Sequence, residues 1–475
     1  MVVSALGALL LIGAAPAGDR LEPGLQGQTL PDDLTTEVLP QPYSKGVRVV
    51  GHSDIGGRTG NLIMAWSGHC SYVAGGVNLK GGMPGANEPL GPTSGIAVID
   101  VRDPRAPKVM HYLQDKGAID AGETMHAVTV RGRAVLAAST YAGVPGMGPT
   151  KSGWLDIYDV SDCANPKLMS EVRWPEASHT LTVSPNGRRV YGTIINPFTG
   201  NGGIQVMDIS DMSHPRFIGK FAVTRPDGSS FAFAPHEISI SPDERRIYAG
   251  VIASKGDDLN AGIKLMPPNS AGLGPDAGGI YILDNSDIVA GNTDPKMRLI
   301  GTVQHGGWHS AVQARIGGVP YLVGSGELGA CPGAWPRITD IADEKNPRVV
   351  GEFRLAMNHK ENCPPPGPIE SATSGVVGGE GTASTHFNDV DSATNTRLGL
   401  FPFLYAGLRI VDLRNPANPV EVAYFKPGDP CASHVRYVSK TGHIWFACSS
   451  SGFHVIELAS QVRSALGMPV KGQTH

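Results

Sequence analysis

The chain contains 475 residues, of which 17% are charged, and its formal net charge at pH 7 is −4. A nucleic-acid partner is excluded because binding DNA or RNA requires a basic face, which this charge balance does not supply. Glycine and proline contribute 62 and 38 residues without a collagen-like period, which favours many short strands and turns over long helices.

The N-terminus has the pattern of a cleaved export signal. An apolar run from Val2 to Ala15 leads into Ala15-Pro16-Ala17, a small-residue cleavage pattern. The run lacks the usual basic start, and it is too short to cross a bilayer. The alternative to a signal peptide is a buried N-terminal helix. We expect residues 1–17 to be a signal peptide and 18–45 an extension. The mature protein is then exported, periplasmic or secreted, with no membrane span.

One sequence phrase recurs between residues 46 and 458. It consists of Gly, a short alternating strand, an acidic residue, a few polar residues, Pro and a further apolar strand. The acidic residues of the seven copies are Asp100, Asp159, Asp208, Asp284, Asp340, Asp412 and Glu457. Hairpins such as HTLTVSPNGRRVYGTI, from His179, precede the copies, so each unit has four strands. The repeat predicts an all-β, seven-bladed β-propeller over residues 46–458, followed by a tail at 459–475.

The last repeat indicates how the propeller closes. GFHVIEL, from Gly452, contains only the first half of the phrase, whereas VRVVGHSD after Gly46 resembles a fourth strand. We expect this N-terminal strand to complete the last blade and leave no open sheet edge. The alternative is an open array of seven units.

Most copies of the phrase place the acid and the proline as Asp-x-x-x-x-x-x-Pro, as in GLRIVDLRNPANP from Gly407. This pattern resembles the LVIVD repeat family of bacterial exported propellers over roughly residues 46 to 458. The resemblance implies the propeller fold and says little about chemistry.

Histidines occupy one position of the repeat. Six of the seven units open their first strand with histidine, and the first unit has Asn61 near that place. The six residues are His126, His179, His236, His309, His386 and His434. Because the first strand of a propeller blade lines the central channel, we expect these imidazoles to form a ring around the axis. Imidazole nitrogens suit copper, zinc, iron or nickel, whereas calcium and magnesium prefer oxygen.

Carboxylates accompany the ring histidines. Glu123 and Glu176 each lie three residues before a ring histidine, and Glu237 directly follows one. A ligating imidazole usually donates its second N–H to a carboxylate or a carbonyl, and we expect Glu123 and Glu176 to move protons. Glu327 and Glu380 lie in loops that could face the same funnel. Any of these carboxylates could equally be a solvated loop charge.

The ring predicts a transition-metal oxidoreductase acting on a small organic or sulfur-containing substrate. Copper is favoured by the all-nitrogen donors and the exported location, iron comes next, and manganese fits as well. In architecture and histidine placement the chain is similar to metal-dependent propeller enzymes such as the methanethiol oxidases, which resemble selenium-binding protein. The alternative is a non-catalytic cell-surface or periplasmic binding scaffold whose histidines are structural.

The six cysteines contain no C-x-x-C pattern, which disfavours a structural zinc knuckle. In an oxidising compartment they are expected to pair. Two pairings are predicted, Cys331 with Cys363 and Cys70 with Cys448. Cys431, three residues before His434, is alternatively a metal ligand or a free thiol.

Overall fold

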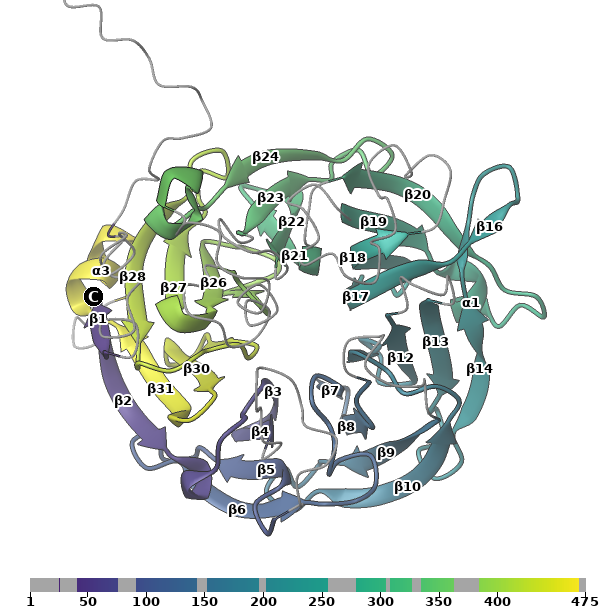
Figure 1. Ribbon diagram of the computed structural model, residues 1–475, viewed down its shortest axis with the longest axis horizontal. Helices are drawn as coiled ribbons and strands as arrows, with labels where there is room; N and C mark the ends of the chain where they lie inside the picture. Colours follow the sequence, from purple (N-terminus) through teal and green to yellow (C-terminus); the bar gives the residue numbers. More distant parts are fainter. Residues whose placement is uncertain are drawn as a thin grey trace, which may run out of the picture.

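The protein folds as a ring of small antiparallel sheets around a central axis, as the computed structural model shows (Figure 1). The structure describes residues 25, 41–75, 91–142, 152–195, 202–254, 279–304, 308–326, 335–362 and 384–469. Seven sheets make seven blades, so the predicted all-β propeller is confirmed. The predicted signal peptide and most of the extension lie outside the described residues, and their boundaries stay predictions. No helix among the described residues is long and apolar enough to cross a membrane.

The first three blades follow one another along the chain, and in each the strands run outward from the axis in order. Blade 1 contains β3 (Ile63–Ser67), β4 (Cys70–Gly75), β5 (Gly95–Asp100) and β6 (Lys108–Leu113). Blade 2 contains β7 (Met125–Val130), β8 (Arg133–Ser139), β9 (Gly153–Asp159) and β10 (Lys167–Trp174). Blade 3 contains β11 (Leu181–Val183), β12 (Arg189–Ile194), β13 (Gly203–Asp208) and β14 (Arg216–Phe221).

Blades 4 to 6 keep this plan, and two of them gain extra strands at the outer edge. Blade 4 contains β17 (Phe233–Ile240), β18 (Arg246–Ser254), β19 (Gly279–Asp284) and β20 (Met297–Gln304), extended by β15 (Val223–Thr224) and β16 (Ser230–Phe231). Blade 5 contains β21 (Trp308–Ile316), β22 (Val319–Gly326), β23 (Arg337–Asp340) and β24 (Arg348–Glu352). Blade 6 contains β25 (Asp389–Val390), β26 (Leu398–Phe403), β27 (Gly407–Asp412) and β28 (Val420–Lys426), extended by β1 (Tyr43–Lys45).

Blade 7 is built from both ends of the chain. It contains β29 (Arg436–Val438), β30 (His443–Cys448), β31 (Gly452–Leu458) and, as its outer strand, β2 (Val47–Ser53). Strand β2 pairs antiparallel with β31, from Val47 opposite Leu458 to Ser53 opposite Phe453. Arg48 of β2 forms an ion pair with Glu457, the acid of the seventh repeat. The predicted closure by the N-terminal strand is therefore confirmed.

Short helices occupy connections between strands and the segment after the last strand. They are η2 (Ile55–Gly57), α1 (Ser286–Ala290), η4 (Ala356–Asn358), η5 (Lys360–Asn362), η6 (Leu404–Ala406) and α3 (Ser460–Ala465). Helix α3 belongs to the described part of the predicted C-terminal tail and lies at the outer rim of the ring, beside β1 and β28 (Figure 1).

In six of the seven repeats the acid stabilises the turn between the third and the fourth strand. Asp100 ends β5, and its Oδ1 accepts a hydrogen bond of 2.9 Å from the backbone N–H of Arg102. The same bond, to the N–H two residues further on, is made by Asp159, Asp208, Asp284, Asp340 and Asp412. An aspartate that bonds its own backbone in this way fixes a turn. The repeat signature is thus a structural requirement of the blade.

Glycine in the fourth strand lets neighbouring blades approach closely. A Cβ atom at Gly351 of β24 would lie 1.9 Å from the carbonyl oxygen of Pro416, in the turn of the next blade. A Cβ at Gly301 of β20 would lie 2.1 Å from the carbonyl oxygen of Glu344. A side chain cannot occupy that space, so glycine stands at these two positions, where one blade contacts the next.

Two disulfides in the described part of the chain correct the predicted pairing. Cys70 bonds Cys163 and so joins blades 1 and 2, whereas Cys431 bonds Cys448 beside blade 7. The predicted pair of Cys70 with Cys448 is wrong because Cys70 begins a second strand and Cys448 ends one, which places them at opposite faces of the ring. Cys431 is neither a metal ligand nor a free thiol. The predicted pair of Cys331 with Cys363 lies outside the described residues.

Stability is expected to depend on pH through Asp156, a buried residue of β9. Burial outweighs the hydrogen bonds that it accepts from the backbone N–H groups of Gly117 and Ala118, and raises its pKa to about 7. The folded state therefore holds this proton more tightly than the unfolded state. Its contribution to stability is full below about pH 4 and falls as the pH rises towards 7.

Asp156→Asn keeps an oxygen acceptor for both N–H groups but cannot ionise. We expect the variant to be more stable than the wild type at pH 8 by roughly 2 to 4 kcal/mol, at about 1.4 kcal/mol per pKa unit, and equal to it near pH 4. Denaturant unfolding at the two pH values measures this. Asp159→Asn is the matched control, because hydrogen bonding to Ser161 lowers the pKa of Asp159 and its loss should destabilise at pH 8. A constant difference across the pH range for Asp156→Asn would contradict the assignment.

Candidate metal centre

The ring histidines lie in the first half of the innermost strands or up to three residues before them. His126, His236 and His309 belong to β7, β17 and β21, while His179, His386 and His434 lie two or three residues before β11, β25 and β29. Asn61 has the equivalent place before β3, where its Nδ2 donates a hydrogen bond of 3.0 Å to the carbonyl oxygen of Ser449 in blade 7. Alignment of the repeats therefore located this layer of the propeller correctly.

Four of the six histidines gather around one carboxylate. The Nε2 atoms of His179, His236 and His309 lie 3.5, 3.8 and 3.8 Å from Oε2 of Glu123. Nε2 of His386 lies 3.3 Å from Oε1 of the same residue. All five side chains belong to residues that are at most 4% exposed. We call these five residues the axial cluster.

The imidazoles of the axial cluster also contact one another in sequence around the axis. Ring centroids are 4.4 Å apart for His179 and His236, 3.8 Å for His236 and His309, and 4.2 Å for His309 and His386. Nε2 of His179 lies 2.9 Å from Nε2 of His236. Side chains from blades 2 to 6 thus meet within a small volume.

Backbone carbonyls orient two of these imidazoles. Nδ1 of His179 donates to the carbonyl oxygen of Ala142 at 2.8 Å, and Nδ1 of His386 donates to that of Ala432 at 2.9 Å. In the neutral form that would bind a metal, the proton stays at Nδ1 and the Nε2 lone pair is directed into the cluster. Metal-ligating histidines are oriented by such bonds to their other nitrogen.

Glu123 is an anion within this group of imidazoles. Burial raises its pKa, but attraction to His386 and His179 in their protonated forms outweighs burial and holds the pKa well below its usual range. The hydroxyl of Tyr141 donates a hydrogen bond of 3.2 Å to Oε1 of Glu123, and the Tyr141 ring lies 5.2 Å from that of His179. Tyr141 is half-buried. The sequence gives no signal for this residue, which follows β8 and has no counterpart in the repeat.

The other two ring histidines lie outside the axial cluster. His434 is 3.1 Å from Oε1 of Glu237 through Nε2 and 3.1 Å from Oδ2 of Asp389 through Nδ1. Burial lowers the pKa of His434, but the two carboxylates outweigh it and raise the pKa to about 10. His434 is therefore an imidazolium that donates from both nitrogens. Its ion pair with Glu237 links blade 7 to blade 4.

His126 has a structural contact of a different kind. Its Nδ1 accepts a hydrogen bond of 3.1 Å from the backbone N–H of Val183 in the next blade. Burial and the positive charge of His434 lower its pKa to about 3. The ring of Phe387 lies between the axial cluster and His434. Its centroid is 4.7 Å from that of His386 and 4.2 Å from that of His434. Phe387 thus separates His434 from the axial cluster.

The predicted carboxylates differ in their positions. Glu123 lies in the axial cluster, whereas Oε1 of Glu176 accepts a hydrogen bond of 2.7 Å from Nζ of Lys220. Within the part of the chain that the structure describes, Glu176 has no contact with the cluster. Glu237 pairs with His434 instead of supporting a metal ligand. Glu327 and Glu380 lie outside the described residues.

The axial cluster has the donors and the spacing of a metal site. Ligand atoms of Glu123, His236 and His309 all lie within 4.8 Å of one another. Two nitrogens bound at right angles at about 2.0–2.1 Å from one ion would lie about 2.9 Å apart, which is the separation of the His179 and His236 Nε2 atoms. Nitrogen donors with one carboxylate suit a transition metal. The structure therefore contains a candidate His/Glu metal site, with no preference among metals.

Comparison with known proteins agrees with the fold. The model of the LVIVD repeat matches residues 199–223 and 404–426, which span the third and fourth strands of blades 3 and 6. No curated protein matches the chain.

Two solved structures are among those to which the chain is similar. The chain is similar to hydrazine synthase of Kuenenia stuttgartiensis, with 13% identity, 88% of this chain and 99% of that chain covered, and a TM-score of 0.49. It is also similar to Sqt1 from Chaetomium thermophilum, with 11% identity, 88% of this chain and 100% of that chain covered, and a TM-score of 0.50. At sequence identities this low, similarity indicates a shared fold and carries no conclusion about function. The protein is a seven-bladed β-propeller that contains LVIVD repeats.

Proposed function

We propose that the protein is an exported, metal-dependent oxidoreductase that holds a transition metal in the axial cluster. Copper is the favoured metal and iron the next. The observation that supports the proposal is the convergence of four imidazole Nε2 atoms on the buried carboxylate of Glu123. The substrate class that we propose is a small organic or sulfur-containing molecule.

A comparison within the molecule favours a metal over a purely structural role for the cluster. His434 illustrates a structural imidazole, because a carboxylate oxygen lies 3.1 Å from each of its nitrogens. In the axial cluster the Nε2 atoms instead point towards one another and share one carboxylate. Burying polar nitrogens side by side costs free energy unless a charge compensates. A bound cation would add to the compensation that the Glu123 carboxylate provides.

The metal and the residues of the axial cluster would have separate roles. A bound copper or iron ion would supply one-electron chemistry and Lewis acidity towards oxygen, water or a thiol. His179, His236, His309 and His386 would hold the ion. Glu123 would balance the charge of the ion, and its Oε1 accepts a hydrogen bond from the hydroxyl of Tyr141. Because Tyr141 is half-buried, it connects the buried carboxylate with the outer part of the site.

Export belongs to the same proposal. The apolar run and the A-x-A pattern of residues 2–17 support it. The disulfides Cys70–Cys163 and Cys431–Cys448 are consistent with it, because disulfides persist in oxidising compartments.

The proposal is tested by metal analysis of protein produced with copper, iron or manganese in the medium. We expect one equivalent of copper or iron per chain, and oxygen consumption by the loaded protein with at least one compound of a panel of small thiols. Metal-free protein of unchanged stability under all three conditions would support the alternative, a binding scaffold with structural histidines. If the protein bound metal but consumed no oxygen, the metal site would stand, but the protein would not be an oxidase of these thiols.

Tyr141→Phe tests the hydrogen bond to Glu123. The variant keeps the ring that packs near His179 and removes only the hydroxyl. Loss of a bond that orients a metal-binding group typically weakens metal affinity about 10-fold or more, and we expect a weakening of that order in a copper titration with a competing chelator. Tyr72→Phe is a matched control, because the Tyr72 hydroxyl donates to the carbonyl oxygen of Cys163. Equal copper affinity in wild type and Tyr141→Phe would contradict the role given to Tyr141.

A further inference from the structure

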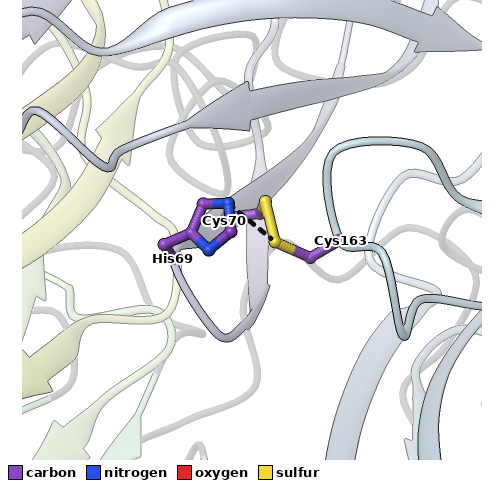
Figure 2. Close-up of side chains that lie close together, drawn as sticks. All are labelled: His69, Cys70 and Cys163. Carbon is purple, nitrogen blue, oxygen red and sulfur yellow. Dashed lines mark hydrogen bonds between the residues drawn. A yellow bond between two sulfur atoms is a disulfide. The ribbon is translucent and has the colours of Figure 1, made fainter.

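A second group of metal-binding side chains lies around the Cys70–Cys163 disulfide. Figure 2 shows the imidazole of His69 beside this bond. Nε2 of His69 lies 3.5 Å from Sγ of Cys163, and the ligand atoms of His69, Cys70 and Cys163 all lie within 4.8 Å of one another. His69 belongs to the hairpin between β3 and β4, and Cys163 to the turn between β9 and β10. The group therefore bridges blades 1 and 2.

We propose that these three residues form a metal site when the disulfide is reduced, with Zn²⁺ or Cu⁺ as the ion. A dithiol reductant transfers two electrons and two protons to the disulfide, which gives the thiols of Cys70 and Cys163, and the reductant leaves as a cyclic disulfide. The ion then displaces the two thiol protons to solvent and binds the two thiolates and Nε2 of His69. In the oxidised protein the sulfurs bond each other and supply no thiolate.

The spacing of the donors supports the proposal. Bonds of about 2.3 Å to sulfur and 2.0–2.1 Å to nitrogen at a tetrahedral ion place the two donors about 3.5 Å apart. Nε2 of His69 and Sγ of Cys163 already have that separation. The two sulfurs would have to move to about 3.8 Å, the distance between two thiolates on one tetrahedral zinc. One imidazole and two thiolates are donors that select zinc or cuprous copper.

The neighbours of the group leave a fourth position for water or a carboxylate. Oδ1 of Asp100 lies 3.9 Å from Nε2 of His69. The His69 side chain is 43% exposed, so an ion can reach the group from solvent at this residue. Cys70 and Cys163 are buried, which keeps the donors in place once they bind. An ion held here would link blades 1 and 2, as the disulfide does in the oxidised protein.

This site is separate from the axial cluster. The ring histidines lie where the first strands begin, whereas His69 lies in the hairpin where a first strand ends. The two groups are therefore at opposite faces of the propeller. The proposal does not depend on the function proposed above, and the two can fail independently.

Cobalt titration of the whole protein tests the proposal, because Co²⁺ bound to thiolates absorbs in the near ultraviolet. Oxidised protein and protein reduced with a dithiol and desalted without oxygen are compared. We expect the reduced protein to bind one Co²⁺ more per chain than the oxidised protein, with thiolate absorption, and Zn²⁺ to displace it. Cys431→Ser/Cys448→Ser, which lacks the other described disulfide, should keep this gain. Cys163→Ser should lose it.

His69→Ala tests whether the imidazole contributes to Co²⁺ binding or whether the two thiolates bind the ion alone. Its side chain is partly exposed, so the variant is expected to fold, and it should bind Co²⁺ at least 10-fold more weakly than reduced wild type. Three results would overturn the proposal: equal cobalt binding by oxidised and reduced protein, an unchanged gain in Cys163→Ser, or a Cys70–Cys163 bond that resists reduction in the folded protein. Cobalt that binds equally to oxidised and reduced protein would be assigned to the axial cluster.

Discussion

Replacing His236 and His309 together by Ala is expected to abolish metal binding. With Glu123 these residues contribute the donor atoms that lie within 4.8 Å of one another, and their loss leaves the carboxylate without two of the imidazoles that surround it. Removing even an outer partner of a metal ligand costs about 10- to 100-fold in affinity, so losing two ligands should weaken binding by well over 100-fold. Metal content after dialysis against a chelator measures the effect.

His126→Ala is the control for this prediction. His126 belongs to the same ring of the repeat but accepts a hydrogen bond from Val183 outside the axial cluster. The variant should keep its metal and lose only some stability. If His126→Ala lost metal as completely as the double variant, the axial cluster would not be the site that we infer.

Starting the chain at residue 54 is expected to prevent folding. The change removes β2, the outer strand of blade 7, together with the ion pair of Arg48 with Glu457. It leaves the edge of β31 unpaired and the ring open, and open edges promote aggregation. Because whole domains are stable by only about 5–15 kcal/mol, loss of a strand and of ring closure should remove most of that stability. Thermal unfolding and size-exclusion chromatography report the outcome.

A chain that starts at residue 46 provides the matched comparison. It lacks β1, whose three residues are exposed at the outer edge of blade 6. We expect its unfolding temperature to stay within a few degrees of the full chain. If the chain that starts at residue 54 unfolded cooperatively at the wild-type temperature, β2 would not close the propeller.

The fold could be predicted from the sequence because each blade repeats one structural requirement. An acid that ends the third strand and bonds the backbone two residues on, as Asp412 does with Arg414, must recur wherever that turn recurs. The half-repeat at Gly452 and the spare strand after Gly46 likewise predict closure, because an open edge is costly.

The candidate site could be predicted only in part. Alignment places a residue along the axis but does not give the direction of its side chain. Glu123 was selected for its spacing to His126, yet its carboxylate extends to imidazoles of other blades. His434 has the same repeat position as His386 but turns towards Glu237 and Asp389. Such choices depend on charges that are near in space and distant in sequence.

The disulfides illustrate the same limit. Sequence spacing does not tell which loops of neighbouring blades meet, and Cys163 lies 93 residues from its partner Cys70. Their contact arises because the hairpin after β3 and the turn after β9 lie at the same face of adjacent blades.

Anomalous diffraction at the copper edge, from crystals of protein loaded with copper, tests the metal centre most directly. We expect one strong peak within about 2.0–2.2 Å of the Nε2 atoms of His236 and His309, and beside Oε2 of Glu123. A crystal in which copper occupies surface histidines while the axial cluster holds no peak would contradict the account.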